Sequence, residues 1–137
     1  MLLMPPKPHL VIDFYGCDAA RLNDLEGLKA ALYEAARTIG ASTIGDLFHQ
    51  FSPHGVTGVL VIAESHLSVH TWVEEGYAAI DMFMCNSNLS SERVEAAVAR
   101  IGAFLRAERS TISAIQRGAA ACTRLSGSSA TASTCTG

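Results

Sequence analysis

The sequence predicts an α+β fold, a two-layer sandwich in which helices pack on one face of a largely antiparallel sheet. Two observations predict it. Helical periodicity occurs near the beginning and near the end of the chain, and the middle holds consecutive strand patterns separated only by short turns. Strands joined by such turns pair antiparallel, because a parallel crossover needs a longer connection.

The first elements are a strand over residues 9–15, where apolar and polar side chains alternate, and a helix over 23–39. Apolar residues recur in the helical segment at intervals of three and four. Asn23 or Asp24 is expected to cap the helix, and Gly40 is expected to end it. This strand-then-helix order begins the α+β arrangement.

The middle of the chain is expected to form strands over 42–51, 56–63, 66–72 and 77–85. The segment 56–63 is almost wholly apolar and rich in β-branched residues, so both of its faces are expected to be buried. A second helix follows, with Ser90 or Ser91 as its cap and an apolar face that extends to Leu105.

Composition indicates a single globular domain. The chain has 137 residues, of which 49% are hydrophobic and 17% are charged, and domains commonly contain about 100–150 residues. We expect the domain to span residues 1–117. Residues 118–137 are dominated by Ser, Thr, Ala and Gly, so we expect a disordered tail there.

Charge and cysteine usage exclude several functional classes. A net charge of −3 argues against a nucleic-acid partner, which calls for a basic face. No apolar run reaches the roughly 18 residues that a membrane helix needs, and the first residues make a poor signal peptide. The four cysteines form no Cys-x-x-Cys pair. We therefore expect a cytoplasmic protein with no membrane partner and no structural disulfides or metal.

Four of the five histidines fall between His49 and His70, together with Glu64 and Ser65, and three interpretations compete. A metal site is disfavoured because a strand would place His66 and His70 about 13 Å apart. A serine hydrolase is disfavoured because Ser65 lacks the Gly-x-Ser-x-Gly turn. In the third interpretation these polar side chains have a structural role, and they form hydrogen bonds with backbone groups at the end of a buried strand.

The same region closely resembles a known family, the short prokaryotic S-adenosylmethionine decarboxylases, which are self-cleaving and pyruvoyl-dependent. The resemblance extends over about residues 9 to 105. It is specific in the order Glu-Ser-His, His-Thr-Trp and Cys. The matching segments are FHQFSPHGVTGV at 48–59, AESHLSVHTW at 63–72, GYAAID at 76–81 and FMC at 83–85.

The resemblance implies a self-processing reaction. Ser65 would attack the carbonyl group of Glu64 and convert the peptide bond to an ester. His70 would accept the α-proton of Ser65, so that elimination cuts the chain, and hydrolysis with loss of ammonia would leave a pyruvoyl group at position 65. Thr57 would stabilise the cyclic intermediate by hydrogen bonding.

The resemblance also implies the mature enzyme. Residues 1–64 would form the β chain and residues 65–137 the α chain, whose pyruvoyl group is the self-derived cofactor. The amine of a small-molecule substrate, S-adenosylmethionine, would form a Schiff base with it, and Cys85 would protonate the product carbon. The product is the aminopropyl donor for spermidine biosynthesis, and the enzyme would be a homodimer with its sites near the interface.

Finer substrate contacts follow from the resemblance as well. Phe51 would pack near the adenine, and Glu74 would hold the ribose or sulfonium region. The chain departs from the family at Val73, Glu75 and Asn86, where a proline, an aromatic residue and a glycine are typical. Because Glu75 adds a second carboxylate beside the site, an arginine or ornithine decarboxylase is the alternative. A non-catalytic homologue and a simple ligand-binding module also remain open.

Overall fold

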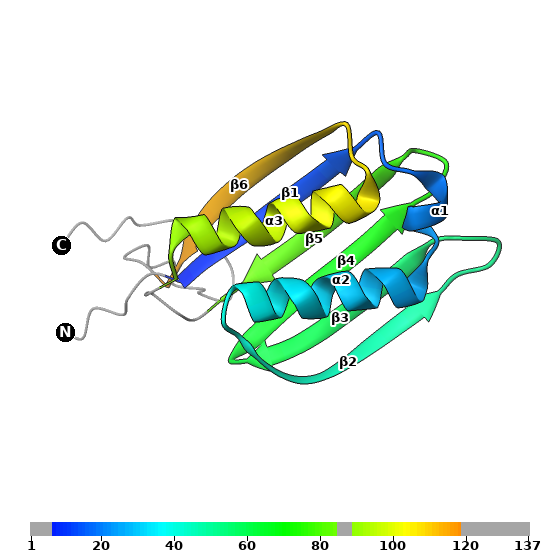
Figure 1. Ribbon diagram of the computed structural model, residues 1–137. Coiled ribbons are helices and arrows are strands. Elements are labelled where there is room, and N and C mark those ends of the chain that lie inside the picture. Colours follow the sequence, from blue (N-terminus) through cyan, green and yellow to red (C-terminus); the bar gives the residue numbers. More distant parts are fainter. Residues whose placement is uncertain (1–6, 85–88, 119–137) are drawn as a thin grey trace, which may run out of the picture.

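The computed structural model describes residues 7–84 and 89–118, and its centre is a six-stranded antiparallel sheet with the order β2-β3-β4-β5-β1-β6 (Figure 1). This confirms the predicted α+β class. The elements are β1 (Lys7–Tyr15), α1 (Ala19–Leu22), α2 (Leu25–Thr38), β2 (Ser42–Gln50), β3 (Val56–Ala63), β4 (Ser65–Trp72), β5 (Tyr77–Phe83), α3 (Ser91–Leu105) and β6 (Arg109–Arg117).

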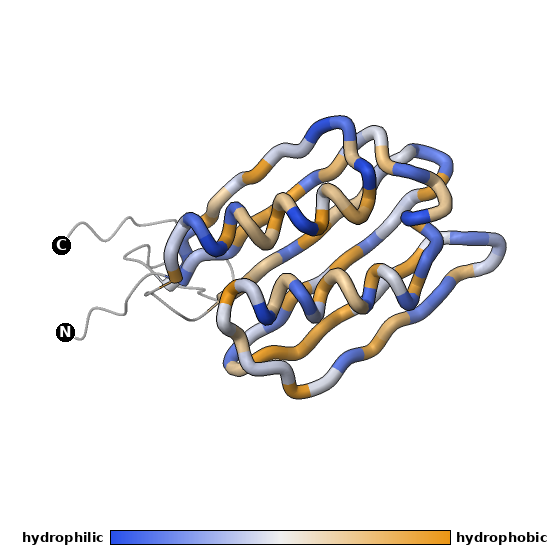
Figure 2. The backbone as a smooth tube through the Cα atoms, in the orientation of Figure 1, coloured by the Kyte–Doolittle hydropathy of each residue, from blue (hydrophilic) through white to orange (hydrophobic). Residues whose placement is uncertain are grey.

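The long helices α2 and α3 lie side by side on one face of the sheet (Figure 1). Figure 2 shows both helices as alternating hydrophobic and hydrophilic bands, as expected of helices that are buried on one side. Their apolar faces meet every second residue of the strands, including Ile12, Leu60, Leu67 and Ile80. In the described part of the chain no helix covers the opposite face, which we call the open face.

The helix ends agree with the sequence analysis. Asp24 caps α2 by accepting a hydrogen bond from the backbone N–H of Gly27, and Ser90 caps α3 through Arg93. Gly40 follows α2 with a φ of +75°, a backbone conformation that favours glycine. The caps therefore fix where each helix meets the sheet.

Three features differ from expectation. The strand β6 was not predicted, because all nine of its residues are exposed at the sheet edge and carry no apolar pattern on a buried face. The four-residue helix α1 was not predicted either. β3 is buried on the helix side only, since Val61 on the open face is 43% exposed. Its apolar composition therefore does not reflect burial on both faces.

Two expectations concern residues outside the described part of the chain. Cys85 lies in the segment 85–88, and residues 119–137 of the tail predicted over 118–137 lie outside the described residues, so neither expectation is tested by the fold.

Candidate functional site

A row of polar side chains crosses the open face near one end of the sheet. His49, Thr57 and His70 are direct neighbours on the paired strands β2, β3 and β4. The Thr57 hydroxyl oxygen lies 3.1 Å from Nδ1 of His70. The structure thus brings together two of the residues that the sequence analysis selected, and their contact orients the imidazole ring.

Two turns adjoin this row. Phe51 begins the turn between β2 and β3, is 49% exposed, and contacts the ring of His49 edge to face at 4.7 Å. His54 in the same turn lies 3.0 Å from a carboxylate oxygen of Glu74, in the turn between β4 and β5. We call the group Phe51, Thr57, His70 and Glu74 the His70 end of the site.

Glu75, the residue behind the arginine and ornithine alternative, also lies in the turn between β4 and β5 and is exposed. Its backbone N–H donates to the carbonyl oxygen of Trp72. The predicted second carboxylate is therefore adjacent to Glu74 in the chain.

The predicted cleavage site lies at the opposite end of β4. Glu64 occupies the tight turn between β3 and β4 and is exposed, while Ser65 begins β4 and is half-buried. Phe83, the last residue of β5, pairs with His66, so β5 ends beside the start of β4. Cys85 follows Phe83 by two residues. We call the group Glu64, Ser65, His66, Ser68, Asp81 and Phe83 the Ser65 end of the site.

The two ends are far apart within one chain. His70 lies five positions after Ser65 along the continuous strand β4, a span of about 16 Å at roughly 3.3 Å per residue. A hydrogen bond or proton transfer between these two side chains needs a separation of about 3 Å. A single chain therefore does not bring His70 to Ser65.

The Ser65 end contains a network that sequence reasoning missed. Asp81 accepts a hydrogen bond from the hydroxyl of Ser68 at 3.2 Å, and its other carboxylate oxygen lies 3.2 Å from Nε2 of His9. The His9 ring packs beside Phe83 at 5.1 Å and beside His66 at 6.4 Å. The only signal in the sequence was an acidic residue among the apolar residues of a strand.

An aromatic row lies next to the His70 end on the open face. Tyr77 stacks between Trp72 and Tyr15, with ring centres 5.2 Å and 5.4 Å away. The Tyr77 hydroxyl donates a hydrogen bond to Asp13. This bond to a carboxylate, with burial and nearby negative charge, raises the pKa of Tyr77 to about 12. Arg109 lies over the Tyr15 ring at 4.2 Å.

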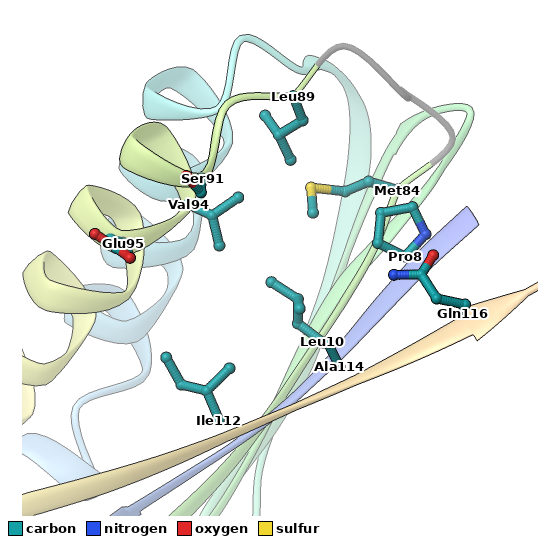
Figure 3. Close-up of a pocket in the computed structure, with 10 residues that line it drawn as sticks. All are labelled: Pro8, Leu10, Met84, Leu89, Ser91, Val94, Glu95, Ile112, Ala114 and Gln116. Atoms are coloured by element: carbon teal, nitrogen blue, oxygen red, sulfur yellow. The ribbon is translucent and has the colours of Figure 1, made fainter. Parts of the chain in front are cut away.

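The helix side of the sheet holds a separate cavity of about 460 Å³ between α3, β1 and β6 (Figure 3). Leu10, Val94 and Ile112 line it, and its lining includes none of the predicted site residues. It is therefore distinct from the open-face site.

Among the described residues, no group of three or more His, Cys, Asp or Glu side chains could hold a metal ion. Within the same residues, every helix is too short or too polar to cross a membrane.

The fold and these side chains define a class of protein: a two-layer α+β sandwich whose polar chemistry lies on the open face of its sheet. The family model described as S-adenosylmethionine decarboxylase matches residues 8–118. The chain belongs to this family.

Individual relatives agree. The chain is 40% identical over 110 residues to the S-adenosylmethionine decarboxylase proenzyme of Methanococcus maripaludis, a match that covers 80% of this chain and 88% of the relative. It is 46% identical over 83 residues to the proenzyme of Acidithiobacillus ferrooxidans, which covers 61% of this chain and 62% of that relative. These names do not support the arginine or ornithine alternative.

A solved structure shares the architecture. The crystal structure of the adenosylmethionine decarboxylase from Aquifex aeolicus superimposes with a TM-score of 0.72 at 30% sequence identity. The superposition covers 90% of this chain and 96% of that chain. The similarity therefore includes nearly the whole of both proteins.

Proposed function

We propose that the protein is a self-processing, pyruvoyl-dependent decarboxylase that converts S-adenosylmethionine to its decarboxylated form, the aminopropyl donor for spermidine biosynthesis. The observation that carries the proposal is the Glu64-Ser65 bond, which lies at a turn between two strands in a member of this family. A bond at a turn can be cut without breaking a row of backbone hydrogen bonds within a strand.

In the proposed processing step, the Ser65 hydroxyl attacks the carbonyl carbon of Glu64 and replaces the peptide bond with an ester. Removal of the α-proton of Ser65 then expels the Glu64 carboxylate and leaves dehydroalanine. Addition of water and loss of ammonia give the pyruvoyl group at position 65. Glu64 becomes the last residue of the amino-terminal fragment.

His70 is the proposed base for the α-proton. Its Nδ1 lies 3.1 Å from the Thr57 hydroxyl oxygen, so an Nδ1–H that donates to Thr57 leaves the lone pair of Nε2 available to accept a proton. Thr57 thus orients the imidazole ring, and as an acceptor it is compatible with the tautomer that can act as a base.

The separation of about 16 Å along β4 leads us to place His70 of the partner subunit against Ser65. A two-fold rotation that reverses β4 exchanges its two ends, so two open faces packed together would bring His70 of the partner subunit to the end of β4 at which Ser65 lies. The open face also exposes apolar side chains, with Leu47 77% exposed and Val61 43% exposed. Burial of such side chains favours association.

After cleavage, the pyruvoyl group supplies an electron sink. It accepts the electron pair that remains on the substrate when the carboxylate leaves as carbon dioxide. Cys85 is proposed to protonate the product carbon, because a cysteine thiol in general is mostly protonated near neutral pH. The exposed ring of Phe51 is proposed to pack against the adenine, and Glu74, held by His54, to bind the ribose or sulfonium region. Glu75 is proposed to lie beside that region.

Intact mass spectrometry and carbon dioxide release test the proposed function. We expect two fragments divided between residues 64 and 65, with the larger lighter than a serine-terminated fragment by the difference between serine and pyruvate. We expect carbon dioxide from S-adenosylmethionine and none from arginine or ornithine. A single uncut mass together with no release would support a non-catalytic homologue instead.

Complementation tests the shared site. Ser65→Ala chains lack the attacking hydroxyl and are expected to stay uncut, whereas His70→Ala chains alone are expected to be cut about 10²–10⁴-fold more slowly than wild type. When the two are co-expressed, a mixed dimer combines an intact Ser65 with an intact His70 at one of its two sites. Faster cleavage of the His70→Ala chain in the mixture than alone supports the arrangement, and an unchanged rate contradicts it.

Cys85 has its own test. Cys85→Ala is expected to lower turnover more than it lowers labelling of the pyruvoyl group by a carbonyl reagent. Unchanged turnover would remove Cys85 as the proton donor.

A further inference from the structure

Asn23, between α1 and α2, holds both sides of the turn that contains Phe51. Its side-chain oxygen accepts hydrogen bonds from Nε2 of Gln50 at 2.9 Å and from the backbone N–H of Gly55 at 3.0 Å. Gln50 ends β2 and Gly55 immediately precedes β3. One oxygen atom therefore joins the two strands at the base of the turn.

The backbone at this position is itself anchored to the sheet. The carbonyl oxygen of Leu22 accepts a hydrogen bond from the hydroxyl of Thr71 at 2.7 Å, and that hydroxyl accepts the backbone N–H of Val56 at 2.8 Å. Leu22 and Thr71 are both buried. Asn23 is consequently fixed relative to β3 and β4 before its side chain contacts the turn.

The turn is closed by a backbone hydrogen bond from Phe51 to Gly55 at 2.8 Å. Gly55 has a φ of +105°, a backbone conformation that favours glycine. A Cβ atom at this position would also lie 3.3 Å from the Thr71 carbonyl oxygen, so other residues are disfavoured here. The Gly55 N–H points to Asn23. The backbone of Phe51 is therefore linked through Gly55 to a residue 28 positions earlier in the chain.

We propose that Asn23 is a positioning residue for substrate binding, which acts by holding the turn that presents Phe51 and His54. The inference rests on the proposed function, because Phe51 is the proposed contact for the adenine. Asn23 makes no chemical step itself. It spares the substrate the entropy cost of ordering this turn on binding.

The proposed role of Asn23 requires only a hydrogen-bond acceptor at Oδ1, so the proposal predicts which substitutions preserve it and which abolish it. Asn23→Asp keeps an oxygen in the same place and should still accept from Gln50 and Gly55. Asn23→Ala removes the acceptor and leaves the Gly55 N–H without its partner. Asp24→Ala is the matched control, since the neighbouring residue caps α2 through Gly27, and among the described residues none of its hydrogen bonds reaches the turn.

The experiment measures two quantities on each processed variant. The first is the exchange rate of the Gly55 amide hydrogen by NMR, which does not depend on any substrate. The second is the pair kcat and KM for S-adenosylmethionine; KM is independent of the fraction of chains that have cleaved.

For Asn23→Ala we expect Gly55 exchange to accelerate at least about tenfold and KM to rise about tenfold, while kcat per cleaved chain stays within about twofold. Asn23→Asp should restore both quantities to nearly the wild-type values. Asp24→Ala should leave both unchanged relative to wild type.

Three results would overturn the inference while the proposed function stands. They are unchanged Gly55 exchange in Asn23→Ala, faster exchange with an unchanged KM, or an equal rise of KM in Asp24→Ala. A wild-type protein that releases no carbon dioxide from S-adenosylmethionine would overturn the proposed function and this inference with it.

Discussion

The two ends of β4 differ in what they contribute to the site. At the Ser65 end, the predicted scissile bond lies in a tight turn, and the ring of His66, the residue after Ser65, lies beside the rings of His9 and Phe83. At the His70 end, the imidazole is fixed by Thr57, and the adjoining turns are tied by hydrogen bonds. The bond proposed to be broken and the proposed base thus occupy opposite ends of one continuous strand, and this separation is the reason for the proposed association of two chains.

The largest expected effect comes from the Ser65 end. Ser65→Ala removes the attacking hydroxyl, so we expect a chain that stays at its full 14.5 kDa and has no decarboxylase activity. Denaturing electrophoresis and intact mass measure this directly. Ser68→Ala, on the same strand, is the control that should still cleave. A cut Ser65→Ala protein would remove the proposed mechanism.

The next effect comes from the His70 end. Loss of a general base commonly slows a reaction by about 10²–10⁴-fold, and we expect His70→Ala to slow cleavage by a factor in that range. The time course of fragment appearance measures it. His66→Ala is the informative comparison, because His66 is next to Ser65 in the chain. If His66→Ala abolishes cleavage and His70→Ala does not, the base belongs to the Ser65 end and the exchange of ends between subunits is unnecessary.

A smaller effect is expected at Thr57. Thr57→Val keeps the shape of the side chain and removes the hydroxyl that contacts His70, so the imidazole loses the hydrogen bond that orients it. We expect cleavage to slow about tenfold, consistent with the loss of one hydrogen bond worth about 1 kcal/mol. Thr57→Ser should retain most of the rate. Equal rates for the valine and serine variants would contradict a role for the hydroxyl.

The smallest expected effect concerns the ionisation of the Tyr77 phenol, which lies beside the His70 end. The pKa of Tyr77 is raised to about 12 by its hydrogen bond to Asp13. Alkaline absorbance titration should show a late phenol ionisation that Tyr77→Phe removes. Because the folded pKa lies above the unfolded value of about 10, the stability from this contact is complete below pH 10 and is lost as the pH rises toward 12. A late ionisation that persists in Tyr77→Phe would contradict the assignment.

The sequence predicted most of the sheet because burial on one face imposes an alternating pattern on the strands. It missed β6, where no residue is buried, and it assigned two buried faces to β3, because an apolar composition does not distinguish a covered face from an open one. A strand that will pack against another chain looks the same in sequence as one in a core.

The site was predicted less completely. The resemblance selected Thr57 and His70, and the structure places them in contact. The separation of His70 from Ser65 follows from the continuity of β4, which the predicted strand over 66–72 already implied, whereas the resemblance names both residues without placing them in one chain or two. Asn23 was weighed only as a helix cap, because its contacts are with residues 27 and 32 positions later. The roles of Ser65 and Cys85 and the cytoplasmic location stay predictions.

The strand order has a consequence for the mature protein. Cleavage after residue 64 would leave β1, β2 and β3 in one polypeptide and β4, β5 and β6 in the other, yet β1 lies between β5 and β6 in the sheet. The two fragments would be interlocked, and neither would contain an unbroken set of neighbouring strands. Refolding from denaturant would then be a bimolecular reaction. The melting temperature of the cut protein should rise with its concentration, whereas a monomeric uncut chain would melt at the same temperature at any dilution.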